Sequence, residues 1–162
     1  MSAHFLVPGG YYFGQPEQRI VTLLGSCIAL VAWHPVRRLT LVSHVVLPCA
    51  PAEGSADTRY GDVMLARWLN DLRQVRAFPD EFRLALFGGS SRLFDQTGFN
   101  RSVGYRNIQW MREALTHLGL PLLQEDCGGE QYRKLAVDGA RGHYEVQLLG
   151  VVAPPLTQES RR

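Results

Sequence analysis

The apolar residues of the N-terminal half fall into two runs that predict a β-hairpin. Residues 20–33 (IVTLLGSCIALVAW) are almost entirely apolar, which is typical of a strand buried on both faces, with an interruption at Gly25-Ser26. Residues 39–47 (LTLVSHVVL) form the second run. The break between the runs contains Pro35, which favours a type I turn, so we expect the two runs to pair as antiparallel strands.

The rest of the chain alternates between helical and strand patterns. Apolar residues recur at three-to-four-residue steps in 63–75 and in 105–118, which predicts two amphipathic helices. Further strands are predicted at 82–87, 122–126, 131–137 and 144–151, the last two as a hairpin, and loops at 49–58 and 92–103. The order β-β-α-β-α-β-β-β indicates the α/β class, with layers around a mixed β-sheet.

Composition narrows the class of protein. The 162 residues suit a single domain, expected at residues 1–156, with a frayed polar tail at 157–162. A net charge of +2 with scattered Lys and Arg gives no reason to expect a nucleic-acid partner. No run reaches about 18 apolar residues, and residues 1–8 do not resemble a secretory leader, so we expect no membrane insertion and a cytoplasmic location.

The three cysteines, Cys27, Cys49 and Cys127, are too widely spaced and odd in number for a disulfide framework. The chain has no CxxC motif and no pair of histidines at metal-ligand spacing, so neither a metal nor another cofactor is expected. At least one thiol therefore fills the core or takes part in chemistry.

Cys27 has two interpretations. A free cysteine in an apolar strand is usually an inert core residue, whereas a cysteine beside a base can act as a nucleophile. If the hairpin turns at Pro35-Val36, Cys27 lies directly opposite His44, with Cβ atoms about 5 Å apart, near the distance at which an imidazole can accept the thiol proton. His44 could equally be a hydrogen-bonded core residue, and a one-residue slip would separate the pair.

Two glycine pairs follow predicted strands. Gly88-Gly89 and Gly128-Gly129 can leave backbone N–H groups free to hold an oxyanion or a substrate, as can the Gly25-Ser26 step before Cys27. Both pairs can also be plain turns. The first is not a P-loop, because no Gly-Lys-Ser/Thr sequence follows it.

Five segments in order carry a family resemblance: 24–30 (LGSCIAL), 43–48 (SHVVLP), 87–94 (FGGSSRLF), 103–107 (VGYRN) and 125–129 (EDCGG). Together they resemble the chemoreceptor glutamine deamidases known as CheD. The resemblance covers about residues 20–130. It implies a three-layer α/β sandwich, related in active-site layout to deamidating bacterial toxins.

The resemblance implies catalytic roles for Cys27 and His44, together with a threonine upstream of the cysteine. In the family pattern this threonine can lie six residues before the cysteine, a position that Val21 occupies here, so Thr22 is the expected substitute. Cys127 also replaces a family threonine. The implied activity is conversion of glutamines on the cytoplasmic helices of chemoreceptors to glutamates through a Cys thioester, with a CheC-type phosphatase as a partner of some members.

Two alternatives to the deamidase remain open at the level of sequence. One is another cysteine hydrolase, such as a receptor methylesterase or a peptidase. The other is a non-catalytic module that keeps the fold and regulates a chemotaxis phosphatase.

Overall fold

The computed structural model describes residues 2–91 and 102–152, which form two β-sheets and two α-helices. A five-stranded sheet has the order β2-β5-β4-β6-β7, and a four-stranded sheet has the order β1-β3-β8-β9. The elements are β1 (Ala3–Phe5), β2 (Tyr11–Gly14), β3 (Arg19–Leu24), β4 (Ile28–Trp33), β5 (Thr40–Ser43), α1 (Gly61–Gln74), the 3₁₀ turn η1 (Pro79–Glu81), β6 (Arg83–Gly88), α2 (Val103–His117), β7 (Leu122–Cys127), β8 (Gln131–Asp138) and β9 (His143–Val151).

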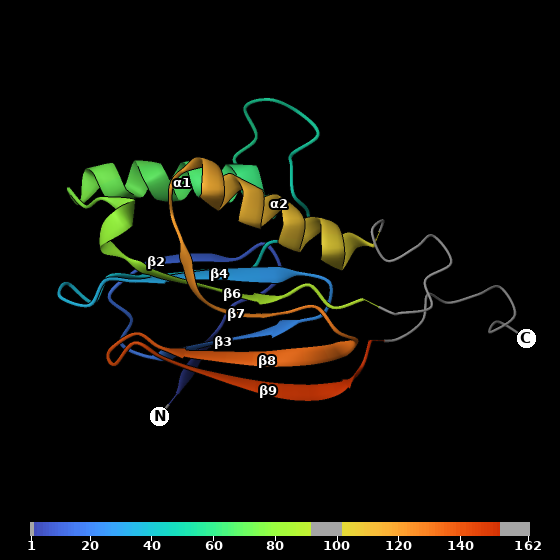
Figure 1. Ribbon diagram of the computed structural model, residues 1–162. Helices are drawn as coiled ribbons and strands as arrows, with labels where there is room; N and C mark the ends of the chain where they lie inside the picture. The colour runs from blue at the N-terminus through green and yellow to red at the C-terminus, as the bar shows by residue number, and fades with distance from the viewer. Residues whose placement is uncertain (1, 92–101, 153–162) are drawn as a thin grey trace, which may run out of the picture.

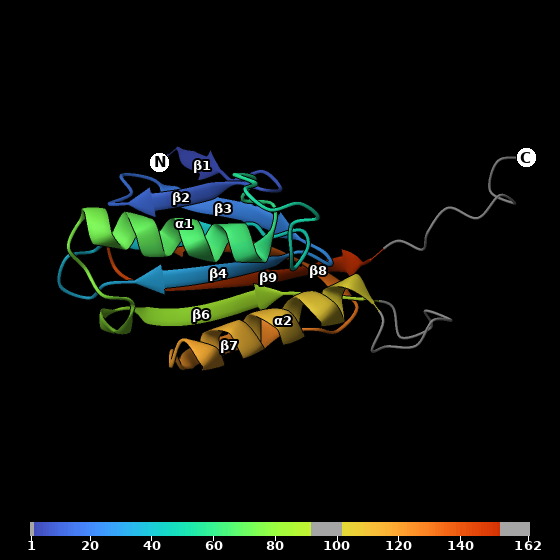
Figure 2. The same ribbon diagram turned by 90° about the horizontal axis from the view of Figure 1, so that it is seen from above.

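The five-stranded sheet lies between the helices and the other sheet (Figure 1). Along β4, Ile28 and Leu30 pack against helix residues such as Trp68, whereas Ala29 and Val31 pack against the four-stranded sheet. Successive side chains of a strand point to opposite faces, so the middle sheet needs apolar residues at every position of β4. Seen from above, α1 covers the half of this sheet that contains β2 and β4, and α2 covers the half with β6 and β7 (Figure 2).

The predicted α/β class with mixed strand pairing is confirmed, because β1 pairs with β3 and β6 with β7 in parallel while the other pairs are antiparallel. The expectation of one sheet is wrong. Residues 20–33 are two strands that belong to different sheets: β3 pairs with β1 and β8, and β4 pairs with β5 and β6. The interruption foreseen at Gly25-Ser26 is where the chain passes from one sheet to the other.

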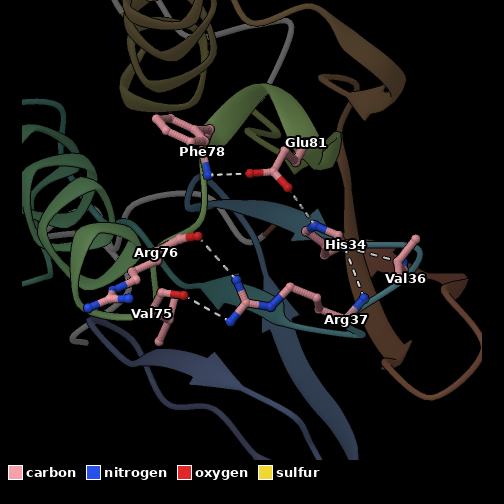
Figure 3. A network of polar contacts seen from close by, with 7 residues as sticks. All are labelled: His34, Val36, Arg37, Val75, Arg76, Phe78 and Glu81. Carbon is pink, nitrogen blue, oxygen red and sulfur yellow. Dashed lines mark hydrogen bonds and ion pairs between the residues drawn. The ribbon is translucent and has the colours of Figure 1, made fainter.

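The hairpin of β4 and β5 is present, but its register is two residues away from the predicted one. Val31 pairs with Val42 and Ala32 with Leu41. Figure 3 shows the cause, since the His34 Nδ1 atom accepts hydrogen bonds from the N–H groups of Val36 (3.2 Å) and Arg37 (3.0 Å) inside the turn. The turn thereby extends to Arg38, which adopts a positive φ of 58°, and the pairing closes at Leu39 instead of Arg37.

The same figure shows how this turn is attached to the helical layer. The His34 Nε2 atom lies 3.1 Å from a Glu81 carboxylate oxygen, and the Arg37 guanidinium donates to the carbonyls of Val75 (2.9 Å) and Arg76 (3.4 Å) (Figure 3). Because these bonds tie the turn to η1 and to the end of α1, they stabilise the longer turn.

The other predicted elements are confirmed with shifted ends, including the final hairpin, in which Asp138 pairs with His143. The buried face of α1 contains Met64, Leu65, Trp68 and Leu72, whereas Val63 and Ala66, apolar residues of the same predicted helix, are not buried. The strands β1 and β2 were not predicted. Residues 92–101 of the predicted loop, and the tail at 157–162, lie outside the described residues.

None of the helices in the described ranges is both long and apolar enough to cross a membrane.

Candidate active site

The loop that carries Cys27 is held by its backbone carbonyls. The Gly25 carbonyl accepts a hydrogen bond from the Ser90 N–H, and the Cys27 carbonyl from the Gly89 N–H, both at 2.9 Å. The carbonyl of Ser26, between them, accepts one from the Asn107 side-chain amide at 2.9 Å. With every carbonyl of the segment bonded, the half-buried Cys27 is placed on a backbone of fixed shape.

Gly88 allows this close approach of strand β6 to the Cys27 loop. Its φ is +100°, which a side chain rarely adopts, and a Cβ atom there would overlap the Cys27 carbonyl oxygen. Gly88 thus has a packing role in the fold, which differs from the oxyanion support predicted for it.

His44 lies directly after β5 and is fixed by the N-terminal segment. Its N–H donates to the Gly10 carbonyl at 3.0 Å, and its carbonyl accepts from the Gly9 N–H at 2.9 Å. The side chain is only 2% exposed. The N-terminal residues therefore form part of the wall around this histidine.

Cys27 and His44 lie on the same face of the five-stranded sheet. The bridge between Ile28 and Val45 continues the β4–β5 register, so Cys27 lies opposite Val46 and not opposite His44 as predicted. The pair are diagonal neighbours, for which Cα separations of about 7–8 Å are usual. Because the register differs from the predicted one by two residues, and not by one, both side chains stay on the same face.

The buried Thr22 hydroxyl on β3 joins the second sheet to this site. Its Oγ1 atom lies 2.6 Å from the His44 Nδ1 atom and 2.7 Å from the Leu6 carbonyl oxygen. A carbonyl can only accept, so the hydroxyl proton goes to Leu6 and the Thr22 oxygen accepts from the His44 Nδ1–H. The unprotonated nitrogen of the neutral ring is then Nε2, which can serve as a base.

Thr22 lies on β3 and Cys27 in the loop that leads to β4, so the two residues do not share a strand and strand parity does not relate their side chains. Parity relates side chains only within one continuous strand. The structure thus brings the Thr22 and His44 side chains into contact although 22 positions separate them in the sequence.

Burial sets the protonation state of the site. It lowers the pKa of His44 from 6.5 to about 4 and raises the pKa of the Cys27 thiol above 9.0. A resting thiolate–imidazolium pair would require shifts in the opposite directions. Both shifts favour the uncharged forms, a neutral thiol at Cys27 and a neutral imidazole at His44.

The two glycine pairs contribute support to the loop. The Gly89 N–H is already bonded to the Cys27 carbonyl, and the Gly128 N–H donates to the Gly88 carbonyl at 2.9 Å. The Gly129 carbonyl accepts from the Ser91 N–H. Within residues 2–91 and 102–152, the N–H groups of Ser26 and Cys27 donate no hydrogen bond, and neither do those of Gly25 and Gly129, so these four amides are candidates for holding an oxyanion.

Several supporting residues were not predicted from the sequence. Arg133, 5% exposed, donates to Ser90 Oγ (2.7 Å) and to Asp126 (3.1 Å), while Ser90 Oγ donates to the Gln131 carbonyl (2.6 Å). Asn107 is the last residue of the motif at 103–107, but the motif alone predicts no role for it. The signal that could have found it is a polar side chain on the apolar face of a predicted amphipathic helix.

The other two thiols differ from Cys27 in their surroundings. Cys49 is exposed on the loop before α1. Cys127, which stands where the family pattern has threonine, donates to the Leu86 carbonyl (3.3 Å), and burial with the nearby Glu125 raises its pKa to about 11.

The structure thus places the Thr22 hydroxyl against the His44 ring and puts the half-buried Cys27 on the same face of the five-stranded sheet as His44. Comparison with known proteins identifies the family. Residues 46–148 match the family described as CheD chemotactic sensory transduction. The chain belongs to the CheD family.

Several relatives are similar over most of the chain. A probable chemoreceptor glutamine deamidase CheD 1 from Chromobacterium violaceum is 38% identical over 144 residues, covering 87% of this chain and 75% of the relative. A probable chemoreceptor glutamine deamidase CheD 3 from Dechloromonas aromatica is 35% identical over 136 residues (83% and 80%). One from Leptospira interrogans, named CheD 1, is 33% identical over 143 residues (81% and 83%).

Proposed function

We propose that the protein is a glutamine deamidase that converts glutamine side chains of chemoreceptors to glutamate, with Cys27 as nucleophile, His44 as base and Thr22 as the residue that orients His44. The observation that carries the proposal is the contact of Thr22 Oγ1 with His44 Nδ1 at 2.6 Å, because it leaves the Nε2 atom free to accept a proton. The family membership and the names of the relatives supply the substrate class.

The first half of the reaction is acylation. The Cys27 sulfur attacks the carboxamide carbon of glutamine while His44 Nε2 takes the thiol proton. The tetrahedral intermediate then collapses, the C–N bond breaks, and the same proton leaves with the amine as ammonia. The free N–H groups of Ser26 and Cys27 stabilise the oxyanion, each well-placed donor contributing about 3 kcal/mol.

The second half is hydrolysis of the thioester. His44 Nε2 takes a proton from a water molecule, the hydroxide equivalent attacks the acyl carbon, and the thiol leaves with that proton. Glutamine and water thus yield glutamate and ammonia. The change adds one negative charge to a receptor helix, which biases how that helix packs between signalling states.

The remaining features follow from the same assignment. The helix–sheet–sheet arrangement supports the three-layer sandwich that the resemblance implies, with residues 1–156 as one catalytic domain. The reaction takes place in the cytoplasm, where the receptor helices are exposed, and a CheC-type phosphatase is the expected protein partner.

Mass spectrometry of a receptor cytoplasmic fragment tests the proposal. After incubation with wild-type protein, specific glutamines gain about 1 Da, the difference between a carboxamide and a carboxylic acid, and ammonia is released. Cys27→Ala abolishes both signals. Cys49→Ser is the matched control, because it also removes one thiol but from an exposed loop elsewhere, and it retains activity.

Other outcomes distinguish the alternatives. Loss of receptor methyl esters without any change at glutamine would identify a methylesterase instead. A Cys27→Ala variant that restores chemotaxis in a deletion strain as well as wild type would identify a non-catalytic module.

A further inference from the structure

Asn107 on α2 links the two segments that carry Cys27 and His44. Its side chain is fully buried, and its Nδ2 atom donates to the carbonyls of Ser26 at 2.9 Å and Val46 at 3.0 Å. Ser26 directly precedes Cys27, and Val46 lies two residues after His44. One carboxamide from the helical layer therefore ties the nucleophile loop to the strand opposite it.

The other end of this carboxamide has an energetic cost. The Oδ1 atom of Asn107 is buried and finds no donor in the part of the chain that the structure describes. The amide cannot be turned over, because its oxygen would then face the two carbonyls that now accept from Nδ2. Burial of an unpaired amide oxygen is unfavourable. The two hydrogen bonds to Ser26 and Val46 therefore offset the free-energy cost of leaving Oδ1 without a donor.

The bond to Ser26 determines the direction of the adjacent amide. A trans peptide is planar, with its C=O and N–H pointing in opposite directions, and the described residues contain no cis peptide. Asn107 lies on the helix side of the five-stranded sheet, as the position of α2 in Figure 1 shows, and draws the Ser26 carbonyl to that side. The Cys27 N–H, which belongs to the same peptide, therefore points away from Asn107.

The approach of α2 to this loop depends on a small residue one turn earlier. A Cβ atom at Gly104 would lie 2.5 Å from the carbonyl oxygens of Gly89 and Ser90. These are the two residues whose N–H groups hold the Cys27 and Gly25 carbonyls. The contact between α2 and the Gly89-Ser90 segment therefore brings Asn107 within reach of Ser26.

We propose that Asn107 is a positioning residue for the oxyanion hole: by holding the Ser26 carbonyl on the helix side, it aims the Cys27 N–H at the oxygen of the substrate carboxamide. This rests on the proposed role of Cys27 as nucleophile. Asn107 itself touches neither the substrate nor the thiol in the reaction.

Steady-state deamidation kinetics of Asn107→Leu, which has a similar side-chain volume and no donors, test the proposal. We expect kcat to fall about 100-fold, the size typical of losing one oxyanion donor, with KM within about twofold of wild type. Alkylation of Cys27 by iodoacetamide, measured in a Cys49→Ser background, should keep its rate. That reaction displaces iodide at a saturated carbon and forms no oxyanion, so it does not need the aimed amide.

Two further variants separate positioning from loss of stability. Met111→Ala removes a fully buried side chain from the same helix and lowers the melting temperature, yet it should keep the kcat of wild type below its transition. Asn107→Asp keeps the shape of the side chain and replaces the donor with an acceptor, so it should lose kcat like Asn107→Leu. It serves as the second test if the leucine variant does not fold.

The outcomes distinguish this inference from the proposed function. If Cys27→Ala is inactive but Asn107→Leu and Asn107→Asp keep the wild-type kcat, the inference about Asn107 is wrong and the nucleophile stands. Equal losses in deamidation and in alkylation, or a rise in KM alone, would also overturn it. If Cys27→Ala still releases ammonia, the proposed function itself fails.

Discussion

Burial of neutral His44 makes the stability of the protein depend on pH in a defined window. The ring is 2% exposed, and burial lowers its pKa from 6.5 to about 4. As the pH falls through 6.5, the unfolded chain binds a proton that the folded protein does not, which favours unfolding. The stabilising contribution of the neutral state is thus complete above pH 6.5 and is lost progressively as the pH falls to about 4.

The magnitude follows from the two pKa values. Their interval corresponds to about 3 kcal/mol of unfolding free energy, of which about 2 kcal/mol is lost by pH 5. Below pH 4 the folded protein also binds the proton, so no further loss arises from this group. A change of this size is a large part of the stability of an ordinary domain.

Urea unfolding of wild type and of His44→Gln at pH 7, 6 and 5, followed by tryptophan fluorescence, measures the effect. Carboxylates titrate in both proteins, so the difference between the two pH dependences isolates His44. We expect wild type to lose about 2 kcal/mol more than His44→Gln between pH 7 and pH 5. Parallel losses in the two proteins would refute the description of His44 as a buried neutral base.

Three further predictions concern the site. The pH profile of kcat/KM should show its acid limb near pH 4, where His44 becomes protonated; a limb near 6.5 would contradict this. Thr22→Val should lower kcat by about 10- to 100-fold at unchanged KM, because it removes the oxygen that accepts from His44. Thr22→Ser keeps this acceptor and should retain most of the wild-type kcat. Equal kcat values for the valine and serine variants would argue against the orienting role of Thr22. Gly88→Ala should lower the free energy of unfolding in urea by more than about 2 kcal/mol, because the strain of a positive φ adds to the overlap with the Cys27 carbonyl. In the control Gly54→Ala, the φ is also positive but no atom lies near, so the loss should be smaller. Similar losses in the two variants would contradict the close approach at Gly88.

The features that depend on local patterns could be predicted from the sequence. Apolar spacing defines both helices, and continuous apolar runs identify strands buried on both faces, because side-chain periodicity within one element follows from backbone geometry alone. Five segments in order, including those around Cys27 and His44, also indicated the family and, through the family, the reaction class. Even the register error left this pair on one face of the sheet, because it amounts to two residues.

The way in which separate segments meet could not be predicted from the sequence and became clear from the three-dimensional structure. The separation of residues 20–33 into two sheets, the Thr22–His44 contact and the Asn107–Ser26 bond all join parts of the chain that are distant in sequence or divided between sheets. The register of the hairpin depends on the side chain of His34, and the pKa of His44 depends on burial by several elements. Such bonds and burial depend on the three-dimensional neighbourhood of a group, which periodicity within one segment does not encode.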